Sequence, residues 1–131
     1  MLLRRTVIFA TAGLAGSAAF SSVSANPSVE VVYVGGWDCP YCTEWKNKYK
    51  ARWVASPEFK KVSYVEVDPP KLREAYQARY WPGDLAPILE QIPRKSGTPR
   101  WLVVKDGKIV ANEFGVSKWT RILDDIKTLV G

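Results

Sequence analysis

The chain has 131 residues and a formal net charge of +6, with 19 Lys and Arg residues against 13 Asp and Glu residues. The cations are spread among the acidic residues and form no stripe, so the sequence does not indicate binding to nucleic acid. With two Cys and no His, the chain offers too few ligands for a structural zinc site, and we expect no metal and no other cofactor.

Residues 1–25 are typical of a secretory signal peptide: a basic stretch ending at Arg5, an apolar run rich in small residues, and a small polar run ending at Ala25. The apolar run has about 15 residues, short of the ~20 that a bilayer span requires, which disfavours a membrane anchor. Arg4 and Arg5 also permit twin-arginine export. We therefore predict a mature domain over residues 26–131, exported to the periplasm or beyond, with no stable membrane insertion after signal removal. Its net charge is +4, because Arg4 and Arg5 leave with the signal.

The mature segment predicts one domain of alternating strands and helices. Runs of β-branched and apolar residues mark the strands, and apolar residues at helical spacing mark the helices. In chain order we expect a strand over 29–34, a helix over 42–55, a strand over 62–67, helices over 72–80 and 84–92, strands over 99–104 and 108–114, and a helix over 117–130.

Local signals refine three of these elements. Asp84 and Ser117 stand where N-cap residues of the two later helices are expected. Asp106-Gly107 is a strong signal for a two-residue hairpin between the last two strands. In the first helix, Trp45, Tyr49 and Trp53 form an aromatic stripe at helical spacing, which we expect to face the core.

The only two cysteines lie in the stretch Trp37-Asp38-Cys39-Pro40-Tyr41-Cys42, between a predicted strand and a predicted helix. Pro40 suits the first turn of a helix, and the N–H groups of a helix start stabilise a thiolate. We expect Cys39, as the more exposed of the two and the closer to those N–H groups, to be the nucleophile. Cys42, three positions later on the same face, would be the resolving thiol.

The element order, with Cys-x-x-Cys after the first strand and Gly97-Thr98-Pro99 before the third, resembles the thioredoxin fold over residues 28–131. The resemblance implies an α/β fold with a central mixed sheet of about four strands flanked by helices. It also implies that Pro99 is cis and that its loop faces the disulfide. The alternative is an ordinary trans proline opening an edge strand.

Cys-Pro-Tyr-Cys itself is similar to the tetrapeptide of glutaredoxins. The basic residue that glutaredoxins carry shortly before the first Cys is absent, since Gly36-Trp37-Asp38 stands there. The glutathione-binding signature of that family is also missing, and Phe114-Gly115-Val116-Ser117 is closer to the thioredoxin version.

Two tyrosines stand where thioredoxins carry a buried acid and its lysine. Tyr33 lies six positions before the first Cys, and Tyr64 matches the lysine by counting back from Asp68. A phenol titrates near ~10, so it cannot accept a proton near neutral pH as a carboxylate can. We expect water or an exposed group such as Glu44 to assist Cys42.

The residues around the cysteines indicate a site for protein substrates. Trp37, Tyr41 and Thr98 are expected to form a partly apolar rim with Pro99. The resemblance to thioredoxins implies that an extended segment of a client could pair there with the backbone of Thr98. Trp101 fits either the rim or the core. Asp38 beside the nucleophile disfavours the thiolate and so favours the disulfide, which argues for a reducing protein.

The sequence therefore predicts a periplasmic thiol-disulfide oxidoreductase that reduces or reshuffles disulfides in specific client proteins. The expected partners are clients carrying disulfides or thiols and a membrane-bound thiol electron donor. Two alternatives remain at this point. One is a dithiol oxidase that introduces disulfides, and the other is a binding module without enzymatic activity in which the Cys39–Cys42 bond is only structural.

Overall fold

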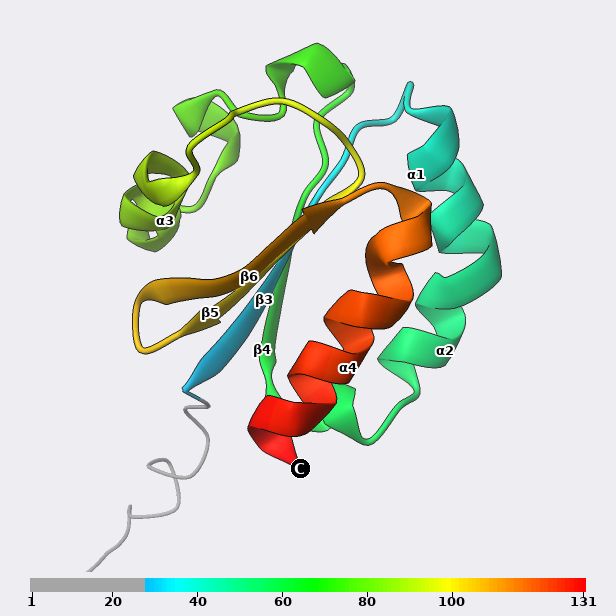
Figure 1. The fold of residues 1–131 in the computed structure, drawn as a ribbon. Helices are drawn as coiled ribbons and strands as arrows, with labels where there is room; N and C mark the ends of the chain where they lie inside the picture. The colour runs from blue at the N-terminus through cyan, green and yellow to red at the C-terminus, as the bar shows by residue number, and fades with distance from the viewer. Residues whose placement is uncertain (1–27) are drawn as a thin grey trace, which may run out of the picture.

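The computed structural model describes residues 28–131, so the predicted signal peptide and its cleavage point lie outside the described range. These residues build a four-stranded sheet with the strand order β4-β3-β5-β6 (Figure 1). Strand β3 (Val29–Val34) is parallel to β4 (Ser63–Val67) and antiparallel to β5 (Arg100–Lys105), which is antiparallel to β6 (Lys108–Phe114). The predicted α/β class with a mixed sheet of four strands is confirmed.

The two central strands, β3 and β5, are apolar along almost their whole length because helices cover both faces of the sheet. Five of the six residues in each are buried. The predicted hairpin after β5 is confirmed: Asp106 and Gly107 form its turn with φ values of 51° and 80°. Positive φ at both central residues is what such a two-residue turn requires.

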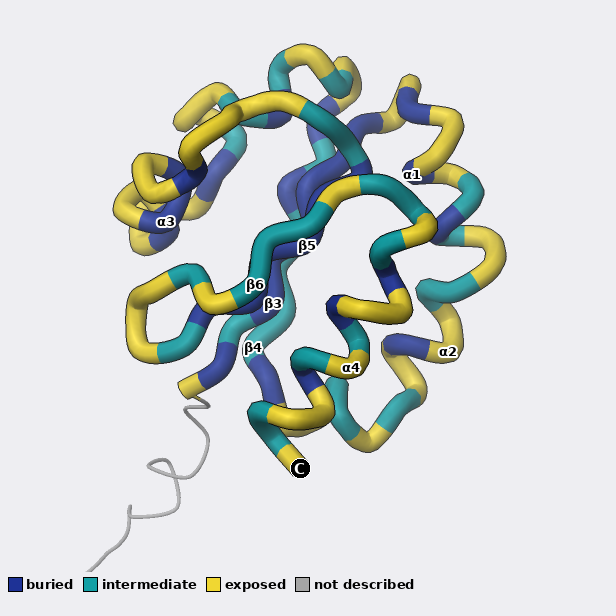
Figure 2. Tube along the Cα trace, in the orientation of Figure 1, coloured by how far each residue is buried: buried dark blue, intermediate teal, exposed yellow. Residues whose placement is uncertain are grey.

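Helices pack against both faces of this sheet (Figure 1). One face carries α1 (Pro40–Trp45), the π-helical turn η4 (Lys46–Lys50), α2 (Ala51–Val54) and α4 (Trp119–Val130). The other carries α3 (Ala86–Gln91). Their buried residues face the sheet (Figure 2). Short 3-10 turns complete the fold, at Glu58–Lys61, Leu72–Glu74, Ala78–Tyr80, Gly83–Leu85 and Val116–Lys118.

The helix after the cysteines begins at Pro40, two residues before the predicted start. The side chain of Cys39 caps this helix by accepting a hydrogen bond from the N–H of Cys42, and Pro40 occupies the first turn, where its missing N–H costs nothing. Helical structure then continues through the π-helical turn to Val54. The cap explains why the first cysteine lies at the boundary of the helix and the second inside it.

The core between the sheet and the helices α1, α2 and α4 is aromatic. Trp45 stacks on Tyr33 with 4.9 Å between ring centroids, and Trp119 packs edge-on to Trp45 at 5.2 Å. Tyr49 packs against this cluster, so the predicted aromatic stripe does face the core. Trp101 is fully buried in this cluster. It therefore belongs to the core and not to the rim of the site, the two positions that the sequence left open.

The helix predicted over 72–80 is wrong. The segment forms two 3-10 turns, Leu72–Glu74 and Ala78–Tyr80, that lie over the aliphatic core on the second face of the sheet. Tertiary contacts replace helical hydrogen bonds here: the indole N–H of Trp81 donates to the carbonyl of Ala75 at 2.7 Å. The apolar spacing was compatible with a helix, but the aromatic side chains bend the segment onto the sheet.

Both predicted N-caps are also wrong. Asp84 lies in a 3-10 turn, and α3 has no side-chain cap. This helix begins only at Ala86, because Pro87 fits no later than the first turn of a helix. Ser117 likewise lies in a 3-10 turn, and α4 begins at Trp119. In each case a tight turn precedes the helix and displaces its start by two residues.

Within residues 28–131, no helix is both long enough and apolar enough to cross a membrane. In the same range, no three His, Cys, Asp or Glu side chains are grouped so that they could hold a metal ion.

Candidate active site

The two cysteines form a disulfide at the edge of the sheet where β3 ends and α1 begins. Their Cα atoms are 5.2 Å apart. Cys39 and Cys42 are almost fully buried, with exposed fractions of 2% and 1%. Exposure therefore does not distinguish them, contrary to the expectation that Cys39 is clearly the more exposed.

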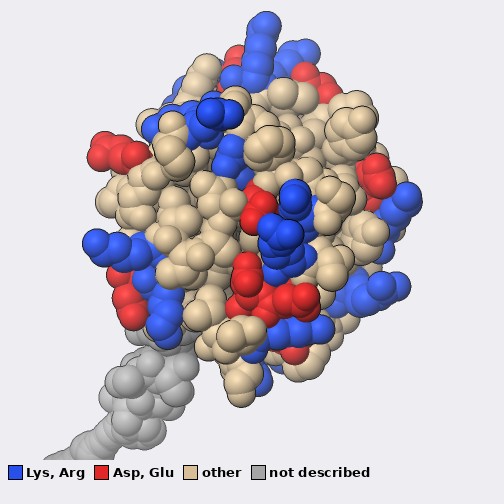
Figure 3. Space-filling view, in the orientation of Figure 1, with Lys and Arg blue, Asp and Glu red and all other residues tan. Residues whose placement is uncertain are grey.

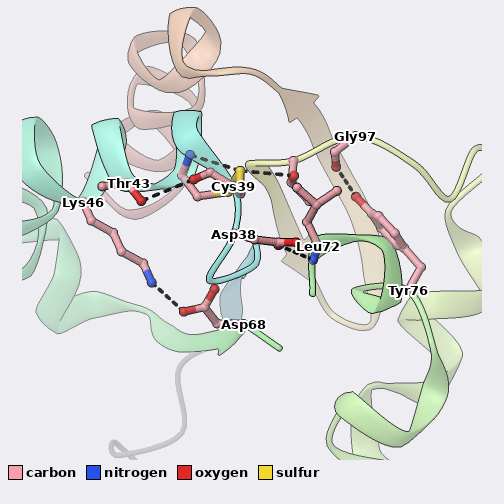
Figure 4. The surroundings of a disulfide bond; sticks show 10 residues. Asp38, Cys39, Thr43, Lys46, Asp68, Leu72, Tyr76 and Gly97 are labelled. Atoms are coloured by element: carbon pink, nitrogen blue, oxygen red, sulfur yellow. Dashed lines mark hydrogen bonds and ion pairs between the residues drawn. A yellow bond between two sulfur atoms is a disulfide. The ribbon is translucent and has the colours of Figure 1, made fainter. Parts of the chain in front are cut away.

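Hydrogen-bond donors converge on the sulfur of Cys39. The backbone N–H of Cys42 donates to it at 3.1 Å, and the hydroxyl of Thr98 donates at 3.3 Å (Figure 4). The carbonyl of Cys39 accepts from the N–H of Thr43 at 3.1 Å, which anchors this residue to the first helical turn. Donors at a sulfur stabilise its thiolate, so the hydrogen bonds favour Cys39 as the nucleophile.

The loop that carries Thr98 is held from two sides. The Thr98–Pro99 peptide bond is cis, and the carbonyl of Pro99, a buried residue, accepts from the N–H of Gly115 at 2.8 Å. The carbonyl of Gly97 accepts from the hydroxyl of Tyr76 at 2.6 Å. The fold thus places the second sequence motif beside the first, although 59 positions separate Thr98 from Cys39.

A buried arginine, which sequence reasoning missed, stabilises this loop. Arg100 is 4% exposed. Its guanidinium donates to the hydroxyl of Tyr76 at 2.7 Å and to the carbonyls of Ser96 and Arg94 at 2.5 and 3.1 Å, and it also donates to Asn112. A lone Arg inside an apolar strand was the available signal, because a buried charge needs several partners.

The predicted rim is only partly brought together. Trp37 and Tyr41 are 70% and 64% exposed. Tyr41 and Thr98 line an open cavity of about 720 Å³ beside the disulfide, together with the exposed ring of Phe114. Trp37 stands on the loop before Cys39 and does not line this cavity. Phe114 is a rim residue that sequence reasoning did not single out.

The two tyrosines below the site cannot serve as proton acceptors near neutral pH. Burial raises the pKa of Tyr33 far above its ordinary value, and Asp68 and Glu66 raise it further. Burial likewise raises the pKa of Tyr64, whose hydroxyl donates to Glu66 at 2.8 Å. The hydroxyl of Tyr33 is buried and has no hydrogen-bond partner among residues 28–131. Both phenols therefore remain protonated.

Two ion pairs join the π-helical turn η4 to the C-terminal end of β4 and the residue after it, and sequence reasoning missed both. Lys46 pairs with Asp68 at 2.5 Å, and Lys50 pairs with Glu66 at 2.8 Å. Two Lys one helical turn apart, opposite two acids spaced i, i+2 on a strand, were the available pattern.

The side chain of Asp38 is hydrogen-bonded to the backbone of the segment after β4. Its carboxylate accepts a hydrogen bond from the N–H of Leu72 at 2.7 Å (Figure 4). Leu72 also packs against Gly36, where a Cβ would lie 2.7 Å from the Leu72 side chain. This contact joins the loop before Cys39 to the segment after β4.

Comparison with known proteins places the fold. Among solved structures, thioredoxin from Malassezia sympodialis superposes with a TM-score of 0.57 at 15% identity, over 86% of both chains. Oxidised thioredoxin from Plasmodium falciparum (0.51, 17%, 85% of this chain and 88% of that one) and thioredoxin f from spinach chloroplast (0.52, 15%, 84% of each) also match. The fold is thioredoxin-like. No family model matches this chain, and no curated protein sequence does.

The thioredoxin-like domain makes room for Tyr33 with a glycine. A Cβ on Gly35 would lie 2.2 Å from the hydroxyl oxygen of Tyr33 and 2.6 Å from its ring. The phenol therefore points along β3 toward the loop that leads to the cysteines. This packing is specific to a tyrosine at position 33.

We expect Gly35→Ala to lower the free energy of unfolding by about 1–3 kcal/mol, because the new methyl overpacks the phenol. Tyr33→Phe removes an unpartnered buried hydroxyl, so it should leave turnover unchanged and stability equal or higher by about 1 kcal/mol. The double variant should recover part of the loss. Urea unfolding of the four proteins measures this coupling.

Gly83→Ala is the matched control, because a Cβ there meets nothing within 4 Å. Strict additivity of Gly35→Ala and Tyr33→Phe would show that the two residues do not interact. A tenfold loss of turnover in Tyr33→Phe would reveal a proton role for the phenol.

Proposed function

We propose that this protein is an exported thiol-disulfide oxidoreductase in which Cys39 and Cys42 exchange disulfides with client proteins. The observation that carries the proposal is the convergence of two donors, the Cys42 N–H and the Thr98 hydroxyl, on the sulfur of Cys39. A disulfide that is merely structural has no need of such donors. They stabilise the thiolate that forms when the bond is reduced.

In the proposed reaction, the Cys39 thiolate attacks one sulfur of a client disulfide. A mixed disulfide forms, and the client's other sulfur leaves as a thiolate that takes a proton from solvent. Cys42 then loses its proton and attacks the Cys39 sulfur, which releases the client's second thiol. The products are a reduced client and the Cys39–Cys42 disulfide. Two electrons from a membrane-bound thiol donor reduce this disulfide again, and the donor is left oxidised.

The proton of Cys42 goes to water or to a nearby carboxylate, because both phenols below the site remain protonated. Glu44 lines the cavity beside the disulfide and is half-buried. Its carboxylate pairs with Lys48 at 3.3 Å, in an exposed contact that leaves it accessible. Glu44 is therefore the candidate acceptor that the cavity offers.

Clients are expected to bind along Tyr41, Thr98 and Phe114, which line the cavity beside the disulfide, with the exposed Trp37 on the adjoining loop and Pro99 behind Thr98. The exposed rings offer apolar contact, and the backbone of the loop at Thr98 offers an edge for an extended segment to pair with. An unfolded or extended client segment fits this surface better than a compact ligand. Specific client proteins are the proposed substrates.

We propose that the protein acts as a reductase, because the carboxylate of Asp38 is adjacent to the nucleophile and penalises its thiolate.

The test of this direction is an equilibrium titration in glutathione buffers of graded ratio. A reductase predicts a midpoint toward the reducing end. Asp38→Asn keeps an oxygen that can accept from the Leu72 N–H but removes the charge, so its midpoint should be less negative by roughly 10–20 mV, which corresponds to somewhat under 1 kcal/mol.

A midpoint at the strongly oxidising end would favour the alternative of a dithiol oxidase. A disulfide that stays closed throughout the titration and also in excess dithiothreitol would instead support a structural bond in a binding module. Export is tested separately, by determining the N-terminus of the protein recovered from the periplasm. Cleavage after Ala25 is the expected result.

A further inference from the structure

A second cavity lies on the far side of Phe114 from the disulfide and encloses about 500 Å³. It is formed by the end of β6, the start of β5, the loop before it and the turn before α4. Figure 3 looks onto this face and shows Lys and Arg side chains together with a few carboxylates. Its polar and aromatic lining consists of Arg94, Arg100, Asn112, Glu113, Phe114 and Lys118.

The charge of this cavity is predominantly positive. Arg94 is exposed, Lys118 is half-buried and Arg100 is buried. Within residues 28–131, no carboxylate lies within ion-pair distance of these three cations. Glu113 is the single acid in the lining, and it pairs with Arg121 on α4 at 3.5 Å. The cavity therefore presents cationic groups with no counter-charge of their own.

The basic cavity adjoins the cavity beside the disulfide, because Phe114 lines both and lies between them. The same ring packs against Gly97, where a Cβ would lie 3.2 Å from it. Gly97 precedes Thr98, whose hydroxyl donates to the Cys39 sulfur. A segment joined to Cys39 can thus run over Phe114 and into the basic cavity.

We propose that the basic cavity binds acidic side chains of the client segment, a few residues from the client cysteine that reacts with Cys39. This inference rests on the proposed function and names its substrate class. Arg94 and Lys118 would pair with Asp or Glu of the client, and burial beside Phe114 would strengthen those pairs. An extended chain advances about 3.3 Å per residue, so two to five residues span two adjoining cavities.

The test uses labelled peptides with one disulfide and either two Glu or two Gln residues placed two to five positions from the cysteine. We expect kcat/KM for the acidic peptide to exceed that for the neutral one by about 5- to 20-fold at low salt, and the advantage to shrink as salt rises. Arg94→Gln and Lys118→Gln should each reduce this advantage several-fold. Lys108→Gln, an exposed cation at the far end of β6, is the matched control.

Two further readouts separate this inference from the proposed function. Binding of a cysteine-free acidic peptide to the oxidised protein tests the basic cavity without any chemistry, and Arg94→Gln should weaken it. The rate of reduction of a small neutral disulfide tests disulfide exchange at Cys39 without use of the basic cavity. Arg94→Gln, Lys118→Gln and Lys108→Gln should all leave this rate unchanged. Equal binding of acidic and neutral peptides would overturn the inference alone.

Discussion

A Cys42→Ser variant is expected to accumulate mixed disulfides with client proteins through Cys39, because the resolving thiol is gone. Turnover should fall by on the order of 10³-fold or more. The donors that converge on the Cys39 sulfur remain in this variant: the backbone N–H at position 42 and the Thr98 hydroxyl. Non-reducing electrophoresis of extracts, followed by release with a reductant, measures the adducts.

Cys39→Ser is the matched control, since it keeps one thiol in the same loop. It should lose turnover to the same extent and form few adducts, because Cys42 is inside the helix and both sulfur-directed donors found within residues 28–131 contact Cys39 instead. Adducts that form in Cys39→Ser and not in Cys42→Ser would reverse the assigned roles.

Arg100→Met is expected to lower the free energy of unfolding of the oxidised protein by about 3–5 kcal/mol. Arg100 is buried, and its guanidinium holds two carbonyls of the loop before Pro99 as well as the hydroxyl of Tyr76. Removal leaves these partly buried oxygens without their donor, and each that water does not reach costs about 1–3 kcal/mol before the loop relaxes. Urea unfolding followed by tryptophan fluorescence gives the value.

The same variant should slow disulfide reduction, because the loop that holds Thr98 against the Cys39 sulfur loses its anchor. Tyr76→Phe is the milder comparison, since it removes one hydroxyl and keeps the guanidinium, and it should cost about 1–2 kcal/mol. A loss below about 1 kcal/mol in Arg100→Met would contradict the structural role given to this residue.

Much of the fold could be predicted because its strands carry strong local signals. The apolar run of β3 and the Asp106-Gly107 turn each specify their structure within a few residues, and the confirmed strands differ from prediction by at most one residue at an end. The cysteines could be located for a similar reason: the helix start that places them depends on Pro40 and on the cap formed by Cys39.

The parts that could not be predicted depend on contacts between distant residues. The segment over 72–80 has helical spacing, but the indole N–H of Trp81 donates a hydrogen bond to the carbonyl of Ala75. Two 3-10 turns form there in place of a continuous helix. Arg100 stands out in the sequence as a cation that begins an apolar strand, but its partners could not be predicted, because the loop of residues 92–99 folds over it and supplies two of its acceptors. Phe114 likewise becomes a rim residue only because β6 ends beside Gly97.

The most direct test of the central claim is reduction of insulin with dithiothreitol as the thiol donor, followed by turbidity, for the wild type and for Cys39→Ser. We expect the wild type to accelerate precipitation well above the rate with dithiothreitol alone, and Cys39→Ser to give only that background rate. A folded wild-type protein that gives only the background rate would contradict the assignment of Cys39 and Cys42 as a working redox pair.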